Sequence, residues 1–307
     1  MKIKRVVDKP LISNDSNSEL GGNINGPTVI KVPEWVSSPL GKYYMYFSHH
    51  QGKYIRMAYA DDLLGPYKIY DGEVLSIDNV PYGGHIASPE IVIDDENKKI
   101  IMFYHGCGVL DKSQAESGQW TTYSESKNGL SFVSDNLYLV PSYLRVVKVG
   151  DKFLGSTGGP TRPVYNFKQS LRTIPEKIAH IDIKSEPFCC FENVEPIDSM
   201  YRMRHLCFDL ESEDCLWIYY SNVCDEPERI KRVCVNPKDW SAASYEEVLQ
   251  SELDYEGVNE PLIKSKGGAK HYPVHELRDP YIINDNGHKY MFYTVAGERG
   301  VAVVEIV

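Results

Sequence analysis

The sequence predicts an all-β protein, a single five-bladed β-propeller domain over residues 1–307. A short β-rich run that opens on or beside a polar or charged residue occurs five times along the chain. A second strand-like run follows each of them, usually across a turn. Repetition of one strand-built unit at a spacing of roughly 60 residues is typical of a propeller, in which every repeat forms one blade.

The first runs are expected to form the inner strands of the five blades, at residues 26–30, 88–92, 143–147, 203–207 and 279–283. The second strands are expected at residues 42–47, 99–104, 152–154, 215–220 and 289–293. Third strands are expected at residues 54–60, 120–126 and 228–236, while the second half of blade three is long and irregular. These runs are rich in aromatic and β-branched residues and are separated by Gly, Pro, Asn and Asp, as strands are. Residues 245–253 are the best candidate for a helix, and they are few.

The last blade needs a strand from the other end of the chain. The residues that follow His275 suffice for three strands, and residues 2–7 are expected to supply the missing one. Pairing the N-terminal strand with the last blade closes the ring and removes the open sheet edges that favour aggregation.

Composition excludes several classes of protein. The net charge of −10 argues against nucleic-acid binding, which needs a basic face. No apolar stretch is long enough to span a membrane, and no signal peptide precedes the first strand, so a cytoplasmic protein is expected. The seven cysteines are odd in number and match no zinc spacing, so they are predicted to be reduced and structural. No cofactor is expected.

Two carboxylates are the candidates for acid–base chemistry. Glu90 and Asp279 each stand beside a proline at the start of an inner strand. Since such a proline begins the strand, the acidic side chain is expected near the mouth of a central funnel. Two carboxylates that face one cavity are what glycoside hydrolysis requires. The alternative for Asp279 is a turn cap that binds backbone amides.

Cationic side chains open the inner strands of blades three and four. Arg145, Arg204 and His205 are expected there, where a guanidinium could clamp an anionic group or instead neutralise the two carboxylates. His49 and His105 follow second strands and are expected to contact a sugar or transfer a proton. Converging imidazoles could bind a metal, but their spacing matches no metal motif, so none is predicted.

Two acidic turns have competing interpretations. Glu298 lies in the turn after the second strand of blade five, either as an exposed pair with Arg299 or at the floor of the funnel. The charges of residues 225–229 are expected to cover a surface turn.

Several segments resemble a known family. Residues 25–27, 41–47 and 54–61 look like the first blade of the five-bladed propeller glycosidases of glycoside hydrolase family 43. Residues 85–90, 204–205, 227–230 and 277–280 resemble poorly characterised bacterial relatives of that family. The resemblance covers most of the chain and is weakest in blade three.

The resemblance implies a set of three acids, which this sequence only partly contains. The family pattern has an Asp base opening blade one, an Asp that modulates a pKa in blade two and a Glu acid in blade three. Gly26 stands at the first position, with the non-ionisable Asn25 beside it, and Glu90 matches the second. Residues 142–145 contain no counterpart of the third.

We therefore expect a glycoside hydrolase-like enzyme that acts on a small oligosaccharide, neutral or anionic, and binds neither nucleic acid nor membrane. The expected catalytic residues are Glu90, Asp279 and His205, with the acid and base roles of the two carboxylates left open. The expected substrate contacts are Asn25, His49, His105, Arg145, Arg204, Arg278 and Glu298. The alternatives are a non-catalytic carbohydrate-binding propeller and a lyase that uses His and Tyr.

Overall fold

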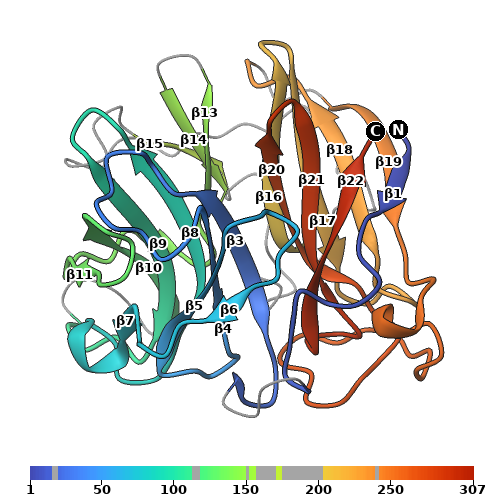
Figure 1. Cartoon of the computed structure of the whole chain (residues 1–307), viewed down its shortest axis with the longest axis horizontal. Coiled ribbons are helices and arrows are strands. Elements are labelled where there is room, and N and C mark those ends of the chain that lie inside the picture. The colour runs from blue at the N-terminus through green and yellow to red at the C-terminus, as the bar shows by residue number, and fades with distance from the viewer. Residues whose placement is uncertain (16–19, 113–117, 150–151, 157–170, 175–202, 239–241) are drawn as a thin grey trace.

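The computed structural model describes all residues except 16–19, 113–117, 150–151, 157–170, 175–202 and 239–241. Antiparallel sheets fan around a common centre, so the predicted all-β single propeller is confirmed (Figure 1). In the described residues the helical elements are short 3-10 turns, η2 (Ile77–Asn79) and η6 (Asp254–Glu256). These same residues include no helix that is both long and apolar enough to cross a membrane.

Four sheets have four or five strands each. The first contains β3 (Asn25–Lys31), β4 (Tyr43–Ser48), β5 (Tyr54–Ala60), β6 (Lys68–Ile69) and β7 (Leu75–Ser76). The second contains β8 (Ile86–Asp94), β9 (Lys99–Cys107), β10 (Gln119–Ser126), β11 (Val133–Ser134) and β12 (Val140–Pro141). The third contains β16 (Met203–Ser212), β17 (Cys215–Asn222), β18 (Ile230–Val235) and β19 (Ala242–Leu249). The fourth contains β20 (Arg278–Asp285), β21 (His288–Val295), β22 (Gly300–Ile306), β1 (Ile3–Arg5) and β2 (Ile12–Ser13).

The structure shows four complete blades where the sequence predicted five. At the predicted third blade it describes a sheet of three strands, β13 (Arg145–Val149), β14 (Lys152–Ser156) and β15 (Leu171–Ile174). Much of the span predicted for that blade, which reached residue 191, lies outside the described residues. The helix candidate was also wrong, because its residues up to Leu249 belong to strand β19.

The chain ends close the last sheet as predicted. Strand β1 pairs antiparallel with β22, with Ile3 opposite Ile306 and Arg5 opposite Val304, and the termini lie side by side (Figure 1). Arg5 also forms an ion pair with the buried Glu256, at 3.0 Å between Nε and Oε1. The N-terminal strand therefore covers the edge that β22 would otherwise expose.

Both faces of the sheets are buried, which explains why the strand sequences are nearly continuous apolar runs. Alternate side chains of β4 point to opposite faces. Tyr44 and Tyr46 pack in a cluster with residues of β8 and β9, whereas Met45 and Phe47 pack with residues of β21 and β22. The first sheet is thus sandwiched between the second and the fourth, and its core lies in these two interfaces between blades.

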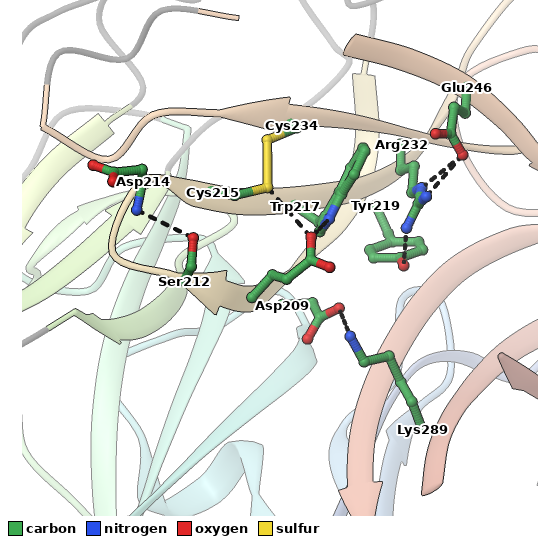
Figure 2. Close-up of a disulfide and its surroundings, with 11 residues drawn as sticks. Asp209, Ser212, Asp214, Cys215, Trp217, Tyr219, Arg232, Cys234, Glu246 and Lys289 are labelled. Carbon is green, nitrogen blue, oxygen red and sulfur yellow. Dashed lines mark hydrogen bonds and ion pairs between the residues drawn. A yellow bond between two sulfur atoms is a disulfide. The ribbon is translucent and has the colours of Figure 1, made fainter. Parts of the chain in front are cut away.

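The prediction of reduced cysteines is wrong for one pair. Figure 2 shows Cys215 of β17 joined to Cys234 of β18 by a disulfide, with the two Cα atoms 5.8 Å apart. Cys107 and Cys207 are free thiols, as expected. The adjacent Cys189 and Cys190 lie outside the described residues.

The inner strands share a local distortion at their openings. The pairing of β3, β8 and β20 with the next strand shifts register at residues 25–28, 87–90 and 278–281. Within these bulges Gly26, Ser88 and Asp279 all have left-handed backbones, with φ of 55°, 55° and 51°, and a proline follows each. Strained backbone and bulges of this kind occur often beside functional sites, where they redirect a side chain.

Candidate active site

The openings of four inner strands meet at one buried cluster. The backbone N–H of Gly26 donates a hydrogen bond to Asp279 Oδ2 at 3.0 Å. A Cβ atom added at Gly26 would lie 3.2 Å from Ser88 Cα and 3.3 Å from His205 Cε1, so a larger residue would have to push these neighbours apart. Residues from β3, β8, β16 and β20 are therefore packed together, although they are far apart in sequence.

Asp279 and His205 face each other through atoms that lack partners. Asp279 Oδ1 lies 3.7 Å from His205 Nδ1, and neither atom has a hydrogen-bond partner among the described residues. Burial, with a contribution from Glu298, raises the pKa of Asp279 to about 6. Burial and the neighbouring Arg145 hold the pKa of His205 well below its usual range. At neutral pH the site thus contains an ionised carboxylate beside a neutral imidazole.

Aromatic rings continue the cluster. Tyr143 packs between His105 and His205, with ring centroids 4.5 Å and 4.3 Å away. Burial raises the pKa of Tyr143 to about 12 and lowers that of His105 well below its usual range. The Tyr143 phenol therefore remains a proton donor at neutral pH, and the predicted contact residue His105 is a neutral imidazole.

A buried network of charges supports the cluster. The fully buried Arg278 lies 3.1 Å from Glu298 and 3.4 Å from Glu228, and it also donates to Glu276. Arg204 donates to Glu228 at 2.8 Å. Protein carboxylates thus surround the guanidiniums of Arg204 and Arg278, both of which were predicted to contact substrate, Arg204 through an anionic group.

Two interpretations of acidic turns are corrected. Glu228 is fully buried rather than part of a surface turn; burial raises its pKa, but Arg204 and Arg278 outweigh burial and the pKa is lowered. Glu298 is also buried, and it accepts a hydrogen bond from the backbone N–H of Lys270 at 3.2 Å. Burial raises the pKa of Glu298, but a hydrogen bond from His50 and the charge of Arg278 outweigh burial and lower it to about 2. The exposed-pair interpretation of Glu298 is therefore wrong.

Glu90 belongs to a different set of contacts from Asp279. Its carboxylate lies 3.5 Å from Arg145 Nε and accepts a hydrogen bond from the backbone N–H of Val146 at 3.4 Å. Burial raises the pKa of Glu90 to about 7 despite these two partners. Glu90 follows Ser88 by two residues, within the bulge of β8. Arg145 is thus the ion-pair partner of Glu90, and an acid–base pair of Glu90 with Asp279 stays a prediction.

The remaining predicted contacts lie around the cluster. Asn25 Nδ2 is 3.1 Å from His50 Nδ1, and Asn25 Oδ1 accepts a hydrogen bond from Ser48. His49 is half-buried, and its ring packs against Gly21. Its neighbour His50 also lies 3.5 Å from Glu298, so His50 rather than His49 contacts the charged network.

Sequence reasoning missed four members of the cluster: Ser88, Tyr143, Glu228 and Glu276. The first two open predicted inner strands, so equivalence between blades was a signal that could have found them. Glu228 lay in the charged run that was assigned to a surface turn, and no sequence pattern marked Glu276. Across the described part of the chain, no group of three or more His, Cys, Asp or Glu side chains could hold a metal ion.

Comparison with known sequences places the chain beside a viral protein. No protein-family model matches it. It is 33% identical over 308 residues to the uncharacterized protein R118 of Acanthamoeba polyphaga mimivirus, covering 91% of this chain and 82% of that protein. The chain belongs to the family of that protein. The relative's name assigns no activity, so family membership leaves the chemistry of the site open.

Comparison with solved structures concerns the fold. A GH43 β-xylosidase/α-arabinofuranosidase from a compost microbial metagenome, in complex with xylotriose, superposes with a TM-score of 0.65 at 14% identity over 100% of this chain and 96% of that one. A GH43_1 enzyme from Xanthomonas citri gives a TM-score of 0.64 at 13% identity over 99% of this chain and 91% of that one. The propeller is therefore of the kind found in family-43 glycoside hydrolases.

Proposed function

We propose that this family member is a carbohydrate-active enzyme of the glycoside-hydrolase type, with Asp279 as its base. The proposal rests chiefly on the burial, the raised pKa and the unpartnered oxygen of the Asp279 carboxylate. Its carboxylate is buried, its pKa is raised to about 6, and Oδ1 has no hydrogen-bond partner in the described residues. A raised pKa and an unpartnered oxygen in a buried polar cluster are typical of a catalytic base.

The position of Asp279 also compensates for a missing family residue. In the family-43 pattern the base opens blade one, where this chain has Gly26. Because the Gly26 N–H holds Asp279 Oδ2, the carboxylate of Asp279 stands directly beside the position that the family base would occupy. Within the proposal, the Tyr143 phenol donates the proton to the leaving oxygen, and Glu90 with Arg145 acts as a positioning pair beneath the site.

The proposed substrate is a small neutral oligosaccharide. The sequence allowed an anionic one, but Arg204 and Arg278 are bound to protein carboxylates, and His105 and His205 are neutral. Two of the similar structures contain xylotriose, which makes xylose oligomers the first sugars to test.

The proposal includes a fifth blade, formed by the sheet of β13, β14 and β15. Strand β13 contacts β8 on one side and β16 on the other, so this sheet lies between two complete blades. With it, the inner strands β3, β8, β13, β16 and β20 contact one another in a ring. The three-stranded sheet would bring Tyr143 and Arg145 to the site, as each of the other blades brings its own residues.

A lyase is the second candidate, and one observation favours it. The Tyr143 ring, whose phenol has a raised pKa, packs edge-on against His105 and tilted against His205, so a tyrosine acid and a neutral histidine base are already adjacent. A carbohydrate-binding propeller without activity is the third, because the family acids of blades one and three are absent.

The test is hydrolysis of a panel of aryl glycosides and short neutral and acidic oligosaccharides. We compare the wild type with Asp279→Asn and Tyr143→Phe, using Asp285→Asn at the far end of β20 as the matched control. Loss of a general base or acid costs about 10²–10⁴-fold in rate. The proposal expects this loss in both variants but not in the control. An unsaturated product would indicate the lyase, and sugar binding without turnover would indicate the binding propeller.

A further inference from the structure

Ser88 joins His205 and Asp279 in an arrangement that glycoside hydrolysis does not need. Ser88 Oγ lies 3.4 Å from His205 Nε2, and the other ring nitrogen of His205 lies 3.7 Å from Asp279 Oδ1. All three side chains are buried, at 3%, 6% and 2% exposure. A hydroxyl, an imidazole and a carboxylate in this order are the nucleophile, base and orienting acid of a serine hydrolase.

The local backbone holds these three groups in place. Ser88 has a left-handed φ of 55° at the start of an inner strand, and its N–H donates to Ser48 Oγ at 3.0 Å. Strained backbone at a nucleophilic serine is a recurrent device for presenting its hydroxyl. The Gly26 N–H binds Asp279 Oδ2, which leaves Oδ1 directed toward His205.

The Ser88–His205 and His205–Asp279 contacts, at 3.4 Å and 3.7 Å, are longer than typical hydrogen bonds. The second contact joins two atoms that have no other partner, which favours its shortening. Asp279 Oδ1 and His205 Nδ1 have no other hydrogen-bond partners in the part of the chain described. A closing movement of at least about 0.5 Å would bring these two atoms within hydrogen-bond distance. Catalytic hydrogen bonds are often long before substrate binds and tighten in the complex.

We propose that Ser88, His205 and Asp279 form a catalytic triad that hydrolyses a short acyl ester carried by a sugar. Ser88 Oγ attacks the ester carbonyl carbon while its proton passes to His205 Nε2. The C–O bond to the sugar then breaks as His205 returns that proton to the departing oxygen, and the acyl group remains on Ser88. A water molecule, deprotonated by His205, attacks the acyl-serine and releases the carboxylic acid and Ser88.

The structure also limits the oxyanion donors and the acyl group. The residue after the nucleophile usually donates its N–H to the oxyanion, but here it is Pro89, which has none. The protonated phenol of Tyr143, whose ring lies 4.3 Å from that of His205, is the donor we assign instead. Because Ser88 is almost fully enclosed, a small acyl group such as acetyl fits best. The triad itself is independent of the proposed function; the assignment of a sugar as the alcohol part of the ester rests on it.

The test is covalent labelling of the full chain with methanesulfonyl fluoride, a small reagent that transfers its sulfonyl group to an activated serine and loses fluoride. Peptide mass spectrometry locates the adduct, and hydrolysis of 4-nitrophenyl acetate gives turnover. The variants are Ser88→Ala and His205→Gln. Ser124→Ala is the matched control, since Ser124 is an equally buried serine of the same sheet, on strand β10.

The triad predicts an adduct on Ser88 in the wild type and in Ser124→Ala. Labelling and ester turnover fall at least about 10²-fold in His205→Gln, the loss expected without a general base, and Ser88→Ala has neither. A folded wild type without an adduct on Ser88, or a folded His205→Gln labelled at the wild-type rate, overturns the proposal. Labelling needs no sugar, so a negative glycoside panel with a labelled Ser88 rejects the proposed function alone.

Discussion

Replacing Asp279 by asparagine is expected to stabilise the protein while it abolishes activity. The ionised carboxylate is held in a buried site beside Glu298, which raises its pKa from 3.8 to about 6. The difference of about two pKa units, at about 1.4 kcal/mol each, corresponds to about 3 kcal/mol of destabilisation when the group is ionised. Asparagine removes that charge and keeps the shape.

The native contacts can accept the substitution. The amide oxygen of the introduced asparagine would accept the Gly26 N–H, and its NH₂ group would donate to His205 Nδ1, which accepts once the neutral imidazole carries its proton on Nε2. Asparagine also tolerates a left-handed backbone, which Asp279 has at a φ of 51°. Neither packing nor strain is therefore expected to offset the gain.

The sign of the pH dependence follows from the raised pKa. A carboxyl whose folded pKa lies above its unfolded value binds more protons in the folded state, so the cost of Asp279 is full above pH 6 and falls as the pH drops toward 3.8. Urea unfolding followed by tryptophan fluorescence should show Asp279→Asn to be more stable by about 3 kcal/mol at pH 8 and by about 1 kcal/mol at pH 4.5. A variant that is less stable at pH 8, or whose advantage is the same at both pH values, refutes this reasoning.

Three further predictions concern the same cluster. Glu298→Gln should have the opposite effect to Asp279→Asn, because the folded pKa of Glu298, about 2, lies below its ordinary value of 4.5. The variant is expected to lose about 3 kcal/mol of unfolding free energy at pH 7, and this loss shrinks as the pH falls through 4.5 toward 2. Equal urea midpoints for the variant and the wild type at pH 7 would contradict this. Gly26→Ala should lower the unfolding free energy, measured in urea, by about 1–3 kcal/mol more than Gly287→Ala does. Both glycines have positive φ, but only a Cβ at residue 26 would press against Ser88 and His205. Equal losses in the two variants would show that this close packing is not needed. Activity should fall as the pH drops through about 6, where the base Asp279 becomes protonated. If activity also falls as the pH rises through about 7, the general acid is Glu90. If no such fall occurs near pH 7, the acid is Tyr143, whose pKa is about 12.

Much of the fold could be predicted because strand periodicity is a local property. The inner and second strands of the first, second and last predicted blades lie within a few residues of their expected bounds, since their apolar runs are buried on both faces. The closing strand was predicted from the shortage of residues after His275. The disulfide between Cys215 and Cys234 was missed because pairing across β17 and β18 depends on register, which spacing along the chain does not determine.

The site was harder to predict, since its members meet only in three dimensions. Prolines marked Glu90 and Asp279, because a proline at a strand start has few alternative roles, but Ser88 on the other side of the same proline was missed. Glu228 was assigned to a surface turn, as a charged run usually is, and only the fully buried Arg278 explains why it lies inside. A pattern of charges along a chain cannot show which of them are paired across blades.

The most direct test of the account is a crystal structure of the protein soaked with xylose or xylotriose. The account predicts a sugar bound at the openings of the inner strands, with a hydroxyl or the glycosidic oxygen within hydrogen-bond distance of Asp279 Oδ1 and a ring beside Tyr143. A sugar bound only on an outer face of the blades, with Asp279 and His205 unchanged and uncontacted, would contradict it.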